Sequence, residues 1–443
     1  MADELTDLTA IEAAELIAEG ELTSEAYVGA CLDRIAAMDG DVRAFAHLDP
    51  DAALAQAQAL DDRQRDGGTL GPLHGVPVAI KDIFDTADYP TECGSPVLKG
   101  RRPREDAAAV ARLRAAGAVI VGKTVTTECA YFHPGPTRNP HDLTRTPGGS
   151  SSGSAAAVAA EMVPLAIGSQ TNGSVIRPAA FCGVYGVKPT HGTISRHGAL
   201  MLSRALDHVG TFARSLGDSA LVLEVLAGYD ARDADTRPVA APNYLALTLE
   251  ELSSPPRLAF VRTPVWDRAD AETRATFEAV AGDLGDAVEE VDLPDDFAAA
   301  WDDHRVVMAT EMAHNLSAMI ARGDDSQSSE ALRTLLAEGA GVSAVRYLAA
   351  RDNALRYRQG LAAILADFDA ILTPATVGVA PIGEATGSPM FCSLWSLTGV
   401  PAVTLPLLTG EAGLPLGLQL IGAPGDDARL LRTASWLVER LTD

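Results

Sequence analysis

Short apolar runs alternate with helical segments and small-residue loops along this chain, and that alternation limits the fold more than any other feature. The runs are rich in Val, Ile and Ala and have the length of buried strands. Strands that alternate with helices favour an α/β fold, in which helices surround a mixed, mostly parallel sheet. The apolar runs are 76–80, 118–121 and 163–167, and the predicted helices between them are 106–116 and 155–160.

Helices are also predicted at the start of the chain. Thr9 and Glu12 have the spacing of a capping box before a helix that ends at Gly20, and a second helix begins at Ser24. Beyond residue 369, strand-like runs return and a closing helix follows. The runs are 370–372, 402–407 and 416–421, and the helix is 427–441.

Residues 230–368 have a different character. They contain one strand-like run at 258–261 and long Ala- and Leu-rich segments with many acidic residues. We interpret this stretch as a helical excursion from the sheet that forms one wall of a cleft. Since there is no internal repeat, we expect residues 1–443 to form a single domain.

The charge balance excludes two classes of partner. Acidic residues number 60 against 35 basic ones, which gives a formal net charge of −25 and disfavours both nucleic acid and anionic membrane surfaces. The first twenty residues carry acids where a secretory signal needs basic residues, and no apolar run is long enough to span a bilayer. We therefore expect a cytoplasmic protein.

The five cysteines are scattered and never spaced as C-x-x-C. This pattern indicates neither a disulfide framework nor a zinc site. Buried free thiols are the expectation, and we predict no metal and no organic cofactor.

Lysine is rare in this chain. Only Lys81, Lys99, Lys123 and Lys188 occur, so nearly every basic side chain is arginine. A lysine can lose its proton near neutral pH when its surroundings favour the neutral form, whereas arginine effectively cannot. Lys81 ends an apolar run and is therefore a candidate base, although a lysine at a strand end is also typical of the protein surface.

Two loops rich in glycine and serine, 148–154 (GGSSSGS) and 168–174 (GSQTNGS), can each bring backbone N–H groups to one point. Neither loop matches a dinucleotide-binding or P-loop pattern, and no G-x-S-x-G elbow is present. His74 and His208 lie near these segments, but scaffold roles suit both better than base catalysis. What remains is a serine nucleophile activated by a lysine.

The motifs taken together resemble the amidase signature family. They cover most of the chain in the family's order, and the resemblance implies an amidase signature fold and amide hydrolysis by a Ser, cis-Ser, Lys triad. The matching segments are VAIKD at 78–82, GKTVTTE at 122–128, TRNPHD at 137–142, GGSSSGS at 148–154, GSQTNGSVIRPAAFCGVYGVKPT at 168–190, LDHVGTFARS at 206–215, LWSLTGVPAVTLPL at 394–407 and LPLGLQLIG at 414–422.

The resemblance assigns roles residue by residue. Ser174 matches the nucleophile, Ser150 matches the serine after a cis peptide bond, and Lys81 matches the base. The oxyanion hole would consist of the backbone N–H groups of Thr171, Asn172, Gly173 and Ser174.

Three departures bear on the substrate. Gln170 stands where many relatives have an aspartate, Asn172 replaces a glycine, and Arg177 lies three residues after the nucleophile. This loop, with LWSLTG near the C-terminus, looks most like the malonamidase branch, in which the matching arginine meets a substrate carboxylate. We therefore expect Arg177 to be freed from a structural pairing and to bind substrate.

The leading interpretation is an amidase that cleaves a small linear amide, malonamate-like if it bears a carboxylate, to acid and ammonia. One alternative is the glutaminase subunit of a tRNA-dependent amidotransferase. Another is an inactive family member that serves as an interaction scaffold. The expected partner is a small amide substrate. The sequence leaves open whether the chain forms a homodimer.

Overall fold

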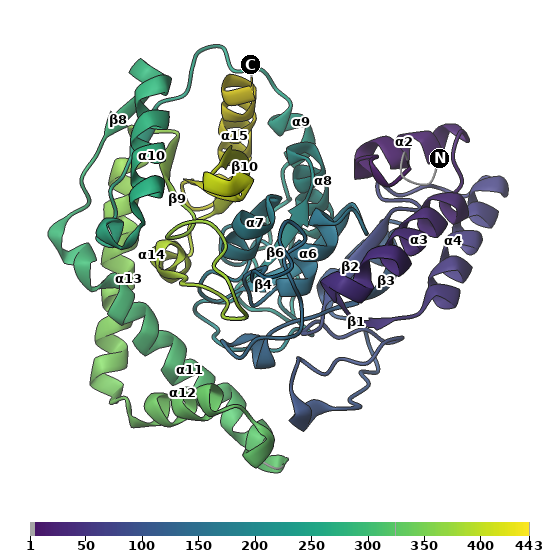
Figure 1. The fold of residues 1–443 in the computed structure, drawn as a ribbon, viewed down its shortest axis with the longest axis horizontal. Coiled ribbons are helices and arrows are strands. Elements are labelled where there is room, and N and C mark those ends of the chain that lie inside the picture. The colour runs from purple at the N-terminus through teal and green to yellow at the C-terminus, as the bar shows by residue number, and fades with distance from the viewer. Residues whose placement is uncertain (1–4, 324, 443) are drawn as a thin grey trace.

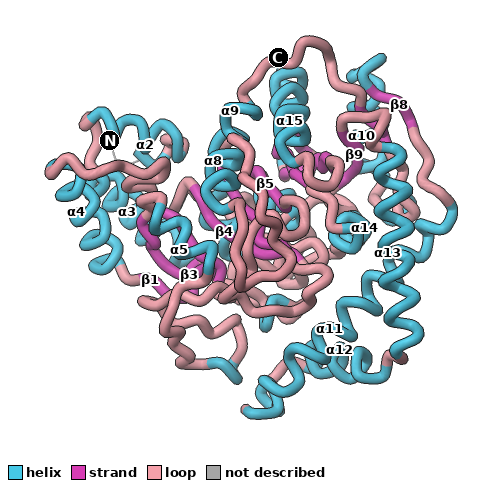
Figure 2. The backbone as a smooth tube through the Cα atoms, turned by 180° about the vertical axis from the view of Figure 1, so that it is seen from behind, coloured by secondary structure: helices cyan, strands magenta, loops and turns pink. Residues whose placement is uncertain are grey.

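The computed structural model describes residues 5–323 and 325–442, and a mixed sheet of eleven strands runs through them. The strands follow one another across the sheet in the order β1-β3-β2-β4-β6-β5-β10-β11-β9-β7-β8. Figures 1 and 2 show the sheet in the centre of the molecule, with helices on its outside. The strands are β1 (Phe45–Leu48), β2 (Pro77–Lys81), β3 (Val119–Thr124), β4 (Leu165–Gln170), β5 (Tyr185–Lys188), β6 (His208–Ala213), β7 (Leu258–Phe260), β8 (Val288–Glu290), β9 (Ala370–Pro374), β10 (Ala402–Thr409) and β11 (Pro415–Ile421).

The helices gather into groups along the sheet. In Figure 1 the helices α2 to α4 lie at one end of the molecule and α10 to α13 lie at the other. The helices are α2 (Ala10–Glu19), α3 (Ser24–Val42), α4 (Pro50–Arg65), α5 (Ala108–Ala115), α6 (Ser152–Ala159), α7 (Ile176–Cys182), α8 (Leu216–Leu226), α9 (Tyr244–Thr248), α10 (Ala271–Leu284), α11 (Ala300–Arg322), α12 (Glu330–Gly341), α13 (Ala344–Ile364), α14 (Met390–Thr398) and α15 (Asp427–Thr442). None of the helices in the described ranges is both long and apolar enough to cross a membrane.

The α/β fold with a mixed sheet is confirmed, but the parallel share is smaller than predicted. In the described chain β2 pairs in parallel with β3 and β4, and β7 pairs in parallel with β8 and β9. The other pairings are antiparallel. Part of the reason lies in the centre of the sheet. There β6 and β5 stand between β4 and β10, and the pairings β4·β6, β6·β5 and β5·β10 are all antiparallel.

The start of the chain agrees with its sequence signals. The Thr9 hydroxyl accepts from the N–H of Glu12, and the Glu12 carboxylate accepts from the N–H of Thr9, which is the predicted capping box. Gly20 ends the helix with a φ of 79°, a conformation that favours glycine.

Residues 230–368 contain α9 to α13, and they also contribute β7 and β8 to one edge of the sheet. In Figure 1 the long helices α11, α12 and α13 lie together, away from α2 to α4. The buried side chains of α11 include Met308 and Met312, which line the cavity described below.

The register of β2 and β4 brings the two glycine- and serine-rich loops together. Ile80 pairs with Ile167, so Lys81 at the end of β2 lies beside the segment in which β4 ends. Parallel strands present their carboxyl ends at one edge of a sheet, where α/β proteins commonly build their sites. The loop before α6 arrives at the same edge, which places Lys81, Ser150 and Ser169 within contact distance.

Candidate active site

Lys81 is fully buried at the end of β2. Its Nζ lies 2.7 Å from the Ser150 Oγ, 2.8 Å from the Ser169 Oγ and 3.5 Å from the Ser169 carbonyl oxygen. Burial is the main cause that holds the pKa of Lys81 well below its usual value, and the positive charge of Arg177 acts in the same direction. Asp207 opposes this shift, but desolvation outweighs it. The surface role that a lone strand-end lysine also permits is therefore wrong for Lys81.

The peptide bond between Gly149 and Ser150 is cis, as the resemblance implies. The neighbouring serines hold the loop in place. Ser152 Oγ donates to the Gly148 carbonyl at 2.8 Å, and Ser151 Oγ accepts from the N–H of Ser169 at 3.3 Å. The two loops named from the sequence are thus hydrogen-bonded to each other.

Ser174 lines the same cavity as Ser150. The polar residues that line this cavity include Ser150, Thr171, Asn172, Ser174, Arg177 and Thr386. Within the described chain, the Ser174 hydroxyl makes no hydrogen bond to Ser150 or Lys81, so it is open to the cavity. Hydrogen bonds between catalytic groups are often long or poorly aligned until substrate binds.

The cavity also has apolar lining residues. Phe132, Leu202, Met308 and Met312 come from separate parts of the chain, and the Phe132 ring centroid lies 5.7 Å from the Arg177 guanidinium carbon. Two of these side chains belong to α11. The cavity is therefore lined by both polar groups and hydrocarbon.

The backbone N–H groups of residues 171–174 are unoccupied among the described hydrogen bonds. The next two N–H groups, those of Val175 and Ile176, donate to the Gln170 Oε1 at 2.8 and 3.0 Å. Gln170 thus fixes the turn while the predicted oxyanion donors stay free. A Cβ on Gly173 would lie 3.0 Å from the Pro389 Cβ, so the loop also passes close to the segment before α14.

Two side chains of this loop are anchored to other elements. Asn172 Oδ1 accepts from Ser393 Oγ at 2.6 Å, and its carbonyl oxygen accepts from Ser396 Oγ at 2.5 Å. Thr171 Oγ1 donates to the Asp207 carboxylate at 2.6 Å. The asparagine that departs from the family's glycine is therefore accommodated by a hydrogen bond to α14.

Two buried groups support Thr171. Its carbonyl oxygen lies 3.0 Å from His304 Nε2, and burial lowers the pKa of His304 to about 4, so this histidine is neutral and donates. Burial raises the pKa of Asp207 to about 6. The other carboxylate oxygen of Asp207 accepts from the N–H of Ser203 at 2.9 Å.

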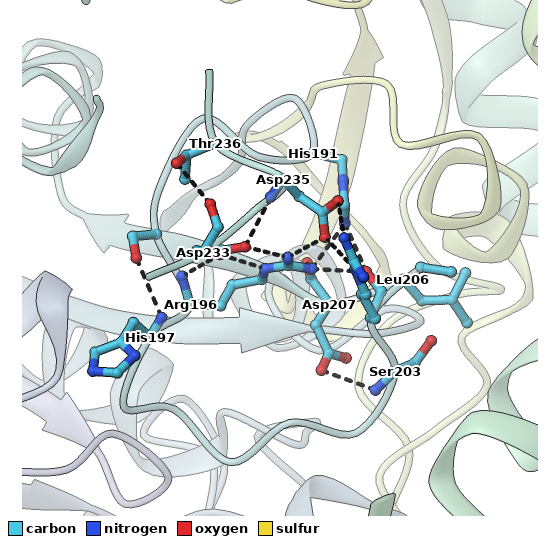
Figure 3. A network of polar contacts seen from close by, with 12 residues as sticks. His191, Arg196, His197, Ser203, Leu206, Asp207, Asp233, Asp235 and Thr236 are labelled. Carbon is cyan, nitrogen blue, oxygen red and sulfur yellow. Dashed lines mark hydrogen bonds and ion pairs between the residues drawn. The ribbon is translucent and has the colours of Figure 1, made fainter. Parts of the chain in front are cut away.

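The segment that carries Asp207 is itself held by a polar network, which Figure 3 shows around Arg196. Arg196 binds the carboxylates of Asp233 at 2.7 Å and Asp235 at 2.5 Å, and it is almost fully buried. Loss of one partner of such a buried ion pair strongly destabilises the folded protein, because the other charge stays buried without compensation. Arg196 also donates to the carbonyl oxygens of Arg204 at 2.7 Å and Asp207 at 3.5 Å, so the network holds the Asp207 segment and, through it, Thr171.

Arg177 is buried at the edge of the cavity. Its terminal nitrogens donate to the carbonyl oxygens of Gly149 at 2.6 Å and Gly387 at 2.8 Å, and burial lowers its pKa to about 10. Its guanidinium pairs with no carboxylate among the described residues. Arg177 thus both braces the loop that carries Ser150 and leaves a cation beside the cavity.

Several polar residues of the site were missed by sequence reasoning. Ser169, Asp207 and Ser396 lie inside segments quoted for the family resemblance, so those segments could have pointed to them. His304, Ser393 and Thr386 lie outside such segments, and no sequence signal marks them. His208, judged a scaffold residue, places its Nδ1 2.6 Å from the Leu206 carbonyl oxygen, and all five cysteines are buried and free, as predicted.

Comparison with known proteins gives matches over nearly the whole chain. Residues 26–431 match the family described as Amidase. The A subunit of the glutamyl-tRNA(Gln) amidotransferase of Chloroflexus aurantiacus is 38% identical over 483 aligned residues, covering 99% of this chain and 98% of the relative. The peptide amidase from Stenotrophomonas maltophilia is 33% identical, with a TM-score of 0.86 and coverage of 98% of this chain and 97% of its own.

A further solved structure, described as an unexpected vestigial protein complex that reveals the evolutionary origins of an s-triazine catabolic enzyme, is 32% identical. Its TM-score is 0.90, and the match covers 98% of both chains. The family match and the identity of the relatives agree with the fold described above. The chain belongs to the amidase signature family and is a hydrolase that acts on carbon–nitrogen bonds of amides.

Proposed function

We propose that this enzyme hydrolyses a small linear carboxylic amide to the acid and ammonia through an acyl-enzyme on Ser174. The observation that carries the proposal is the 2.7 Å contact between the buried Lys81 amine and the Ser150 hydroxyl, in a cavity that Ser174 also lines. Neutral Lys81 takes a proton from Ser150, and Ser150 takes one from Ser174. The Ser174 oxygen then attacks the amide carbon.

The negative charge that develops on the carbonyl oxygen is received by the N–H groups of residues 171–174. The proton held by Lys81 returns through Ser150 to the leaving nitrogen, and ammonia departs. A water molecule repeats the same sequence on the acyl-enzyme and releases the acid. This assignment of roles is supported by the free state of those N–H groups among the described hydrogen bonds.

We propose that residues 1–443 form one amidase domain, in which 230–368 is a helical excursion. The support is the sheet, which takes strands from β1 at residue 45 to β11 at residue 421. The excursion adds β7 and β8 to that sheet and places Met308 of α11 at the cavity.

For the substrate, we propose a carboxylate-bearing amide of the malonamate type, as in the malonamidase branch. The support is the buried guanidinium of Arg177, which lines the cavity and has carbonyl partners but no acidic partner among the described residues. A planar guanidinium is suited to bind a carboxylate.

A second candidate is the glutaminase subunit of a tRNA-dependent amidotransferase. The observation that favours it is the 38% identity, over 99% of this chain, to the A subunit of such an amidotransferase. The alternative of an inactive scaffold is disfavoured by the intact contact between Lys81 and Ser150.

Ser174→Ala should reduce amide hydrolysis by several orders of magnitude, because removal of a nucleophile usually has that effect. With hydroxylamine present, the wild-type enzyme should form a hydroxamate, since an acyl-enzyme can be captured by that amine. Ser254→Ala, in an exposed loop, is the matched control and should retain activity. Residual activity of Ser174→Ala above about 1% would assign the nucleophile elsewhere.

Lys81→Arg should abolish activity at every pH, because an arginine does not become neutral. In the wild-type enzyme, activity should be present above the lowered pKa of Lys81 and should fall as the pH drops through that pKa, because the base must be unprotonated. The measurement is kcat/KM against pH. Lys99→Arg, at an exposed site, is the control, and an active Lys81→Arg enzyme would exclude the base role.

Arg177→Ala should lower kcat/KM on malonamate by roughly 30-fold or more, because the loss of a buried charged partner commonly costs about 2 to 5 kcal/mol. Neutral amides of similar size, such as propionamide, should lose much less. The two substrates are compared on the same enzyme preparations. Equal losses on both would show that Arg177 only braces the Gly149 and Gly387 carbonyl groups.

The two candidate functions are separated by expression of the chain alone. A stand-alone amidase should release ammonia from small amides without ATP or tRNA, and gel filtration should show a monomer or homodimer. A glutaminase subunit should require partner subunits for efficient turnover of glutamine. Dependence of activity on such a partner would favour the second candidate.

A further inference from the structure

Two buried polar atoms of residues that line the cavity have no hydrogen-bond partner within the described chain. They are the Nε of Arg177 and the Oγ1 of Thr386. Both residues are at least nine-tenths buried, with exposed fractions of 3% each. A buried donor or acceptor without a partner is costly, so a pair of them at one cavity points to a ligand that satisfies both.

Thr386 lies in the segment between β9 and α14, and this segment is fastened to the loop that leads to Ser150. The N–H of Thr146 donates to the Pro381 carbonyl oxygen at 3.2 Å, and the N–H of Gly383 donates to the Thr144 carbonyl oxygen at 2.9 Å. On the other side of Thr386, the Arg177 guanidinium donates to the Gly387 carbonyl oxygen at 2.8 Å. Thr386 is therefore in a fixed position relative to Arg177.

The methyl group of Thr386 is packed against the backbone, whereas its hydroxyl has no hydrogen-bond partner within the described chain. Its methyl carbon is directed at the backbone before Ser150, since a Cβ added to Gly149 would lie 2.9 Å from that methyl carbon. A β-branched side chain whose methyl group is packed in this way is restricted to one χ1 rotamer. The hydroxyl is thus the group that Thr386 can present to a bound molecule.

The charge of the cavity determines what kind of molecule fits. Arg177 keeps its positive charge, since its pKa of about 10 lies above neutral pH, and its described partners are two neutral carbonyl groups and the Phe132 ring. Lys81, the lysine of the site, is driven toward its neutral form by burial. The Arg177 cation therefore favours a group that is negatively charged and accepts hydrogen bonds.

We propose that Thr386 is a specificity-determining residue, whose hydroxyl and the Arg177 Nε together bind the distal carboxylate of the substrate. This inference rests on the proposed amide hydrolysis at Ser174 and names its substrate class, the monoamides of short dicarboxylic acids. In the bound state the carboxylate accepts from Arg177 Nε and from Thr386 Oγ1, and both orphaned atoms acquire partners.

The test compares Thr386→Val, which keeps the shape and loses the hydroxyl, with Thr386→Ser, which keeps the hydroxyl. On malonamate and succinamate, Thr386→Val should lower kcat/KM by about 10- to 100-fold, the range expected for one hydrogen bond to a charged group. The loss on propionamide and butyramide should be much smaller, and Thr386→Ser should recover most of the activity on the anionic amides. Equal losses on anionic and neutral amides, or no loss on either, would overturn the inference.

A binding measurement separates failure of this inference from failure of the proposed function. Titration calorimetry with malonate and succinate, in the Ser174→Ala background, requires no turnover. Both anions should bind, and Thr386→Val should weaken their binding by a similar factor to its effect on kcat/KM. If neither anion binds and the wild-type enzyme hydrolyses only neutral amides, the carboxylate subsite is wrong while the amidase proposal stands. If the anions bind as expected and the wild-type enzyme hydrolyses no amide, only the amidase proposal fails.

Discussion

The exclusion of water from one lysine amine is the constraint on which the site depends. A neutral amine has one lone pair and two N–H groups, and Lys81 has three oxygen neighbours within 3.5 Å. If the Ser150 hydroxyl donates to the lone pair, the two N–H groups are left for the hydroxyl and carbonyl oxygens of Ser169. The neutral amine is then fully satisfied, whereas a charged ammonium would be buried with no counter-ion among its described contacts. The two serine-rich loops therefore stabilise the form of lysine that can accept a proton.

The oxyanion loop draws its rigidity from distant parts of the chain. Thr171 is held by Asp207 and by His304 of α11, and Asn172 is held by two serines of α14. These partners lie far from the loop in the sequence, and two of the elements that supply them are the helices α11 and α14. The shape of the loop therefore depends on the packing of these helices. Preorganised donors of this kind need no rearrangement during the reaction. The catalytic geometry and the tertiary fold are consequently one cooperative unit.

The sequence was sufficient for the α/β class and several strands, because hydrophobic periodicity carries that information locally. The meeting of Lys81 with Ser150 was predicted only through the family resemblance of the motifs. The sequence was insufficient for β5 and β6, which contain glycine and the polar residues Lys188 and His208. Those two strands take part in three of the six antiparallel pairings of the described chain, which is one reason why a mostly parallel sheet was predicted wrongly. His304 and Thr386 reach the site through tertiary contacts alone, and no local pattern distinguishes them from their neighbours.

The scarcity of lysine in this chain has a practical chemical consequence. Three of the four lysines, Lys81, Lys123 and Lys188, are fully buried, and Lys99 is exposed. Amine-reactive labels therefore have a single lysine to modify on the folded enzyme, in the segment that follows β2 and precedes α5. A support or fluorophore attached through Lys99 would leave the buried amine at the end of β2 untouched. Reaction at the three buried lysines would, in turn, report directly on unfolding.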